Sequence, residues 1–185
     1  MKQALLVIDA QQALIDGTEG ENPVFQKDTL IKNINTVITQ AQQAGALLVF
    51  IRDKDVAKGE GSGFQVHADI QVPQEAHIFD KKATNSFYGT PLQSFLTEHD
   101  IKHLVIMGCA TEYCIDTAVR TATVNGFDVT LVGDGHSTPG SDTLTAEQII
   151  SHHNRILHGH YNVDHFSVVR NTGDDLFQPI HNQYR

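Results

Sequence analysis

Three kinds of reactive side chain stand shortly after apolar segments of this chain. Asp9 follows LLVI, Lys81 and Lys82 follow HIFD, and Cys114 closes the stretch GCATEYC, which follows LVIM. A further polar residue, Asp134, follows the run TLVG. A carboxylate can take a proton from a thiol, a lysine can stabilise the thiolate by its charge, and the thiolate can attack a carbonyl. These residue types therefore predict nucleophilic catalysis, provided that the fold brings them together.

The surrounding sequence alternates between segments typical of strands and of helices. Short β-branched or apolar runs predict strands at residues 4–8, 46–51, 77–79, 103–107, 129–132 and 166–169. Apolar residues at helical spacing predict helices at residues 29–44, 91–99, 112–125 and 145–158. This alternation predicts an α/β fold with a doubly wound parallel sheet and helices on both faces. Because ligands bind beyond the carboxyl ends of such strands, the reactive side chains are expected at one edge of the sheet.

The two cysteines of the chain have different predicted roles. Cys114 stands at the start of a predicted helix, where free backbone N–H groups and the helix dipole favour a thiolate and can bind an oxyanion. A lone cysteine is more often a small buried apolar residue, but the strand-to-helix position of Cys114 favours a nucleophile. Cys109 follows Gly108 at a strand end and is expected to serve in packing.

Length, charge and cysteine content exclude several classes of protein. With 185 residues, the chain is long enough for a single domain over residues 1–185 without disulfides. Its 13 basic and 22 acidic residues give a net charge of -9, which disfavours nucleic acid and anionic membranes as partners. No apolar run has the roughly 18 residues of a membrane helix, and no signal peptide is recognisable, so a cytoplasmic location is expected. Two cysteines fit reduced thiols there.

The least regular segment, residues 53–75, contains three closely spaced glycines and is too long for a simple connection. These glycines lack the Lys-Ser and helix of a phosphate loop, so we interpret the segment as a mobile loop near the ligand. The eleven histidines offer no pair with an acidic partner at the spacing of a metal site. Packing or solvated histidines are therefore the favoured interpretation.

The ordered segments LLVIDAQQ, KKATNSFYGTPL, LVIMGCATEYCIDTAVRTA and NGFDVTLVGDGHST resemble the isochorismatase-like cysteine hydrolase family. The resemblance extends from Lys2 to about Val169. It implies a three-layer, Rossmann-like fold with a mainly parallel six-stranded sheet in the order 3-2-1-4-5-6.

The resemblance also implies roles for individual residues. It identifies Asp9, Lys81 and Cys114 as the catalytic set, with Lys82 as the alternative lysine. It implies a cis peptide bond between Cys109 and Ala110, and an oxyanion hole formed by the N–H groups of Ala110 and Cys114. The expected substrate-binding residues are Phe64, His67, Phe87 and Tyr113, although His67 could equally pack within a loop.

The chain departs from the family where some members bind a metal. Nicotinamidases of this family hold a metal through an aspartate and histidines after the second strand, but the segment here reads FIRDKD. Asp53 stands where a family histidine is common, and His67 alone cannot complete a site. No metal and no cofactor are therefore expected.

The leading hypothesis is a metal-independent hydrolase that cleaves a C–N bond in a small amide, ureido or cyclic amide compound through a thioester. One alternative is a nicotinamidase-like or isochorismatase-like hydrolase, although true isochorismatases lack the nucleophilic cysteine. Another is a non-catalytic protein of the same fold with a reactive thiol. Such a sensor needs no acid to move its proton, so Asp9 favours catalysis. The partners expected are a small-molecule substrate and a second copy of the chain, in a homodimer or larger homo-oligomer.

Overall fold

The strands and helices of this protein alternate along the chain. The computed structural model describes residues 1–177, so the last eight residues of the predicted domain, 178–185, lie outside the described residues. The strands are β1 (Lys2–Ile8), β2 (Leu47–Asp53), β3 (His77–Lys81), β4 (Ile101–Cys109), β5 (Asp128–Ser137), β6 (Tyr161–Asn162) and β7 (His165–Arg170). The longer helices are α2 (Lys27–Ala44), α4 (Leu92–Glu98), α5 (Asp116–Val124) and α6 (Ala146–Leu157). Four short turns complete the described elements: α1 (Gln12–Asp16), η1 (Val56–Gly59), α3 (Gly61–Phe64) and η2 (Thr111–Ile115).

The described strands form one sheet in the order β3-β2-β1-β4-β5-β7-β6. Every neighbouring pair is parallel except β6 and β7, which are antiparallel. The predicted α/β class is confirmed, and the predicted strand order is correct for β1 to β5 and β7. The sixth strand of that order is β7, because β6 is an additional edge strand. With only two residues, β6 is too short to produce a recognisable sequence pattern.

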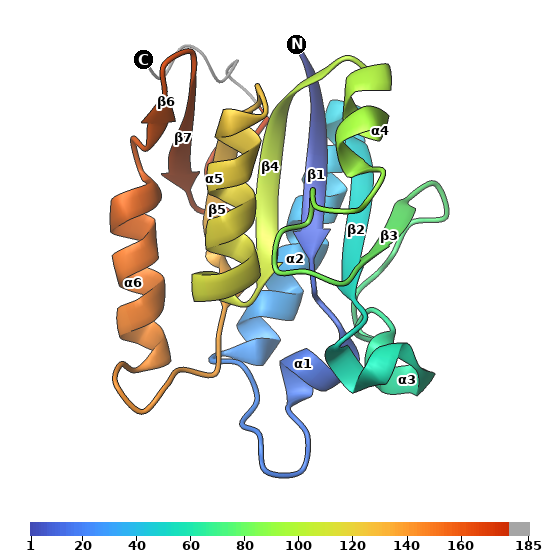
Figure 1. The fold of residues 1–185 in the computed structure, drawn as a ribbon, viewed down its shortest axis with the longest axis vertical. Helices are drawn as coiled ribbons and strands as arrows, with labels where there is room; N and C mark the ends of the chain where they lie inside the picture. The colour runs from blue at the N-terminus through green and yellow to red at the C-terminus, as the bar shows by residue number, and fades with distance from the viewer. Residues whose placement is uncertain (178–185) are drawn as a thin grey trace.

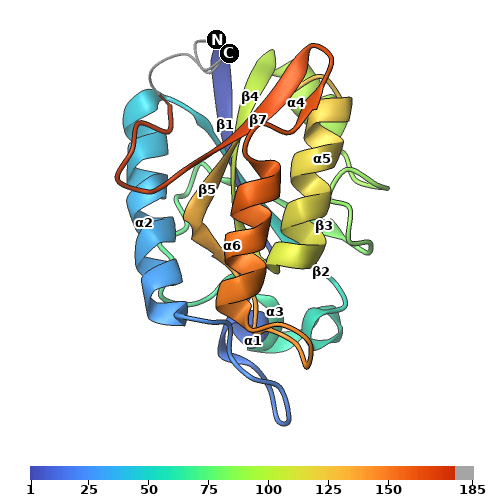
Figure 2. The same cartoon turned by 90° about the vertical axis from the view of Figure 1, so that its left-hand side faces the viewer.

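Helices cover both faces of the sheet (Figures 1 and 2). Helix α2 lies on one face, and α4, α5 and α6 lie on the other. Alternate residues of β1 serve the two layers: Leu5 and Val7 pack on the α2 side, whereas Leu6 and Ile8 pack on the opposite side. The central strand is therefore apolar on both faces, as expected for a parallel sheet enclosed by helices.

The helix ends follow from local sequence. Helix α2 ends at Gly45, which adopts a left-handed conformation with φ 66° and donates its N–H to carbonyls of the last turn. Helix α6 begins with a capping box between Thr145 and Gln148. The helix predicted at residues 112–125 differs from expectation, because its first turn, η2, is a π-helix that continues into α5. The segment predicted as a loop at 53–75 contains η1 and α3.

The carboxyl ends of the central strands meet at the edge where α1, η1 and α3 lie, at the bottom of Figure 1. The chain begins at the opposite end of the sheet. None of the helices within residues 1–177 has the length and apolar character needed to cross a bilayer. The edge with the three short turns is therefore the place to examine for a site.

Candidate active site

Asp9 stands immediately after β1, between the ends of β2 and β4. Its N–H donates to the Ile51 carbonyl at 2.8 Å, and only 1% of the residue is exposed. Strand β4 approaches β1 closely here because of Gly108, which has a φ of +124°. A Cβ atom at Gly108 would lie 2.0 Å from the Ile8 carbonyl oxygen, so only glycine permits this approach. The close contact places the Asp9 carboxylate beside the segment that follows β4.

Lys81 is the last residue of β3, and its ammonium group is enclosed by three acceptors. Its Nζ lies 2.9 Å from Asp9 Oδ2, donates a hydrogen bond to Asp53 Oδ2, and donates another to Cys114 Sγ at 3.3 Å. An ammonium group has three N–H donors, so these acceptors match its full capacity. The neighbouring Lys82 is exposed. The structure thus brings Lys81, and not Lys82, to Asp9 and Cys114.

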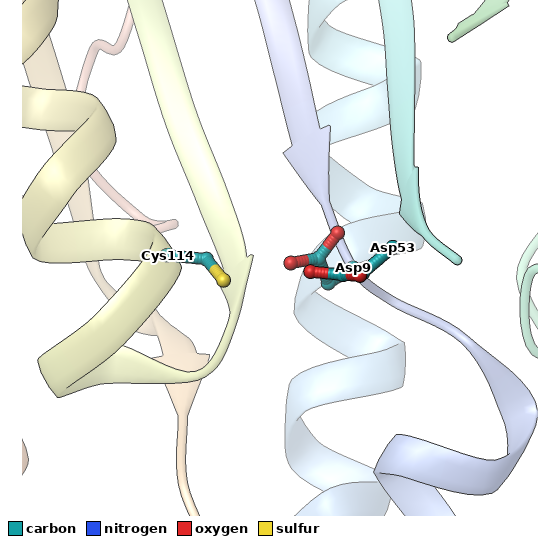
Figure 3. A group of neighbouring side chains, drawn as sticks. All are labelled: Asp9, Asp53 and Cys114. Atoms are coloured by element: carbon teal, nitrogen blue, oxygen red, sulfur yellow. The ribbon is translucent and has the colours of Figure 1, made fainter. Parts of the chain in front are cut away.

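Cys114 lies in the π-helical turn η2, which follows a cis peptide bond between Cys109 and Ala110. The cis bond occurs at the position implied by the family resemblance. In Figure 3 the sulfur of Cys114 points toward the carboxylates of Asp9 and Asp53 from the other side of the site. One donor atom from each of these three side chains lies within 4.8 Å of the other two. Cys109, by contrast, is fully buried in the core, as predicted.

The η2 turn is fixed by side chains from β5 and the segment after it. Thr111 Oγ1 is hydrogen-bonded to His136 Nδ1 at 2.9 Å, and His136 Nε2 is bonded to Asn154 Oδ1 at 2.9 Å. Burial lowers the pKa of His136 to about 4, so this histidine is neutral at physiological pH. Thr138 Oγ1 also donates to Glu112 Oε1 at 2.9 Å. These contacts hold the turn that carries the thiol without adding a charge to it.

Burial dominates the ionisation of the central side chains. It raises the pKa of Asp9 to about 6, even though the positive charge of Lys81 opposes the rise. Burial and the neighbouring Asp9 carboxylate raise the pKa of the Cys114 thiol to about 12, again against the effect of Lys81. Burial alone lowers the pKa of Lys81. The negative charges of Asp9 and Cys114 and the hydrogen bond to Asp53 raise it by a larger amount, so the net change in the pKa is upward.

At neutral pH the resting groups are therefore a carboxylate, an ammonium and a thiol. The sequence-based expectation that the helix start favours a resting thiolate at Cys114 differs from this result. Desolvation and the adjacent negative charge outweigh the favourable position, and both depend on tertiary packing. A proton must then leave Cys114 during attack rather than before it.

A cavity of about 550 Å³ opens onto Asp9 and Cys114. Its walls come from α1, from the segment after β2 and from η2, and the lining residues are Asp9, Ala13, Leu14, Thr18, Glu21, Asp53, Asp55, Val56, Ala57, Lys58, Thr84, Ala110, Tyr113 and Cys114. Tyr113, a predicted substrate-binding residue, lines the cavity and is 62% exposed. The segment after β2 lies near the cavity as predicted, whereas its mobility stays a prediction.

The other predicted substrate-binding residues lie outside the cavity lining. Phe64 is buried beneath the guanidinium of Arg52, whose carbon is 4.4 Å from the ring centroid. Phe87 stacks on Phe127 in the core, with ring centroids 6.2 Å apart. His67 is buried, and its Nε2 lies 3.4 Å from Asp16 Oδ1. Packing of Phe64 and Phe87 was not revealed by the sequence pattern, whereas packing within a loop was the stated alternative for His67.

Asp9, Asp53 and Cys114 present the kinds of atom that bind metals. However, the Lys81 ammonium contacts all three side chains. A metal ion among these donors would stand next to an enclosed positive charge, which is electrostatically unfavourable. The donor set therefore does not fit a metal ion while Lys81 holds this position.

Sequence reasoning gave no role to Asp53 or Gln11. Asp53 ends β2 at the same edge as Asp9, and this position was the available signal. The Gln11 side chain binds both backbone groups of Asp53 and is fully buried. Asp134, which the sequence singled out, instead lies within β5 and accepts hydrogen bonds from the N–H and hydroxyl of Thr172.

Known proteins share this sequence pattern and fold. The model of the isochorismatase domain matches residues 3–150 of the chain. The chain belongs to the isochorismatase family. The family resemblance predicted from its motifs is therefore confirmed. An isochorismatase family protein of known crystal structure superposes with a TM-score of 0.81 at 27% identity, covering 91% of this chain and 98% of that one.

Two curated proteins illustrate the range of relatives of this isochorismatase family member. A streptothricin hydrolase from Streptomyces noursei is 31% identical over 155 residues, which cover 78% of this chain. A ureidoacrylate amidohydrolase, RutB, from Klebsiella pneumoniae is 28% identical over 160 residues, which cover 64% of this chain. The matched regions span 60% and 66% of the lengths of these two relatives.

Proposed function

We propose that this chain is a metal-independent cysteine hydrolase that cleaves a C–N bond in a small amide, ureido or cyclic amide compound. The observation that carries the proposal is the Lys81 ammonium, which joins the Asp9 carboxylate to the Cys114 thiol at a cavity. A base, a charge-stabilising group and a nucleophile within hydrogen-bonding reach are the parts that thiol catalysis requires.

In the first half of the reaction, Asp9 takes the proton from the Cys114 thiol as the sulfur attacks the substrate carbonyl. Oδ1 of Asp9 suits this task because it is buried and accepts no hydrogen bond from residues 1–177. The pKa of Asp9, about 6, suits a group that gains and loses a proton near neutral pH. The protonated Asp9 then donates to the leaving nitrogen, the C–N bond breaks, and a thioester remains on Cys114.

In the second half, water attacks the thioester carbonyl while Asp9 takes a proton from that water. The C–S bond breaks, the acid product leaves, and the proton returns from Asp9 to the Cys114 sulfur. The N–H groups of Ala110 and Cys114, two residues that line the cavity, would stabilise the oxyanion of both steps. A single donor of this kind typically contributes about 10²–10³ in rate.

The relatives support cleavage of an amide-like bond. One is named a streptothricin hydrolase and another a ureidoacrylate amidohydrolase. The cavity of about 550 Å³ suits a compact compound and not a polymer. The specific compound is the part of the proposal that a substrate screen must supply.

The proposal is tested with a panel of small primary amides, ureido acids and lactams. Ammonia release is measured for the primary amides and ureido acids, and ring opening is measured for the lactams. Intact-protein mass spectrometry of quenched reactions is expected to find the substrate's acyl group on the wild-type chain and on Cys109→Ser, but not on Cys114→Ser. Turnover that persists in Cys114→Ser would refute the proposed nucleophile. If Cys114 reacts with alkylating agents but no member of the panel is turned over, the reactive-thiol alternative is favoured.

A further inference from the structure

Asp53 contacts the ammonium of Lys81 but has no part in the two steps above. We propose that Asp53 is a positioning residue, which holds Lys81 beside Cys114 during the period in which Asp9 is protonated and has lost its charge. This inference rests on the proposed reaction, because only a reaction that moves a proton onto Asp9 creates that period.

The proton transfer removes one of the two negative charges that hold Lys81. In the resting protein, Nζ lies 2.9 Å from Asp9 Oδ2 and also bonds to Asp53 Oδ2. Protonation removes the Coulomb attraction between the Asp9 carboxylate and the ammonium, so protonated Asp9 holds Lys81 more weakly. Asp53 is then the carboxylate that holds Lys81 in place, while negative charge develops on the substrate oxygen or on the Cys114 sulfur.

The two carboxylates are not equivalent as proton acceptors. Both oxygens of Asp53 accept hydrogen bonds, Oδ2 from Lys81 and Oδ1 from the Asp55 N–H at 2.9 Å. Oδ1 of Asp9 accepts none within residues 1–177. The Asp53 side chain is also 15% exposed, whereas that of Asp9 is 1% exposed. The buried Oδ1 of Asp9 is therefore the carboxylate oxygen available to the proton.

The anchor is itself fixed by the sheet. Asp53 and Lys81 are register partners at the ends of the parallel strands β2 and β3. The buried Gln11 side chain donates to the Asp53 carbonyl at 3.0 Å and accepts from the Asp53 N–H at 2.7 Å. Figure 3 shows the Asp53 carboxylate next to that of Asp9 and facing Cys114. Strand pairing and Gln11 thus fix the backbone of Asp53, and this fixed position lets its carboxylate hold Lys81.

The chain offers a matched control one residue earlier on both strands. Arg52 and Asp80 are also register partners, and Arg52 Nε donates to Asp80 Oδ1 at 2.8 Å. Successive residues of a strand point to opposite faces, so this second pair lies away from Lys81. Asp80→Asn removes one carboxylate charge from a β2–β3 pair, as Asp53→Asn does, without touching the ammonium.

The first measurement follows alkylation of Cys114 by iodoacetamide between pH 5 and 9, with the modified peptide identified by mass spectrometry. Asp53→Asn removes a negative charge close to the sulfur, so ionisation of the thiol should move to lower pH. The alkylation rate at pH 7.5 is expected to rise by roughly tenfold. Asp80→Asn should follow the wild-type profile. The gain should vanish near pH 5, below the Asp9 pKa of about 6, because no carboxylate of the pair except Asp53 then holds Lys81 beside the sulfur, and this variant lacks it. A gain of equal size at pH 5 and at pH 7.5 would reflect the lost charge alone and would overturn the inference.

The second measurement uses asparagine at position 9 as a mimic of protonated Asp9. In a crystal structure of Asp9→Asn, Lys81 Nζ is expected to stay within hydrogen-bonding distance of Asp53 and Cys114. In Asp9→Asn/Asp53→Asn it should move away from the sulfur. If Lys81 leaves Cys114 in the single variant, Asp53 is not the anchor. Neither measurement needs a substrate, so the role of Asp53 is tested separately from the proposed reaction.

Discussion

Replacing Asp9 with asparagine is expected to stabilise the fold at neutral pH while it abolishes the proposed reaction. Burial raises the pKa of this carboxyl from the ordinary value of 3.8 to about 6, after the opposing effect of Lys81 is included. That difference corresponds to about 3 kcal/mol in the free energy of unfolding. Asparagine has nearly the same shape and carries no charge, so it avoids the cost of ionising a buried group.

The upward shift in the pKa of Asp9 determines how its contribution to stability depends on pH. Folded Asp9 binds a proton more tightly than unfolded Asp9, so its favourable contribution is complete below the ordinary value of 3.8. The contribution is lost progressively as the pH rises toward and through about 6. The variant and the wild type should therefore have similar stability near pH 4, and the variant should be more stable by up to about 3 kcal/mol at pH 7.5.

Urea denaturation followed by far-UV circular dichroism, at one protein concentration and one ionic strength, measures this difference at both pH values. Other titrating groups are common to the two proteins, so the change in their difference isolates position 9. A difference that does not change with pH would refute the conclusion that Asp9 is ionised at the expense of stability. Loss of turnover in the stabilised variant would show that its charge serves function.

Three further outcomes are expected. Cys114→Ala should lose all turnover with an unchanged circular dichroism spectrum, whereas Cys109→Ala should retain most activity; the reverse result would exchange their roles. Gly108→Ala should lower the free energy of unfolding by roughly 2–5 kcal/mol, because its Cβ would lie 2.0 Å from the Ile8 oxygen at a φ of +124°. An unchanged melting temperature would contradict this. Dialysis against a strong chelator should leave activity intact, since Lys81 holds the position between the donor side chains. Activity that is lost and then restored by zinc, iron or manganese would contradict it.

The sequence was sufficient to predict the fold and the position of the central side chains. Apolar runs followed by Asp9, Lys81 and Cys114 mark strand ends, and the carboxyl ends of parallel strands must meet at one edge. The choice of Lys81 over Lys82 came from the family resemblance, and alternation along a strand explains why only one can face inward. The homo-oligomer and the cytoplasmic location stay predictions.

Other features depend on tertiary contacts that a linear pattern does not contain. Phe64 and Phe87 are aromatic residues near the expected site, but their partners Arg52 and Phe127 lie in other segments and draw them into packing. The raised pKa of Cys114 depends on the depth of burial and on the distance to Asp9. The sequence marks Asp53 only as the residue that stands where a family histidine is common, and its contact with Lys81 depends on the pairing of β2 with β3.

The groups that would perform the reaction and the walls that surround the substrate come from different parts of the chain. The former stand at the ends of sheet strands and in η2, whereas much of the wall comes from α1 and from Val56, Ala57 and Lys58. Changes in the wall segments can therefore alter which compound fits without disturbing the hydrogen bonds around Lys81. Such a division lets new substrate preferences evolve on a constant reaction, and directed evolution of this protein would begin by randomising residues 56–58.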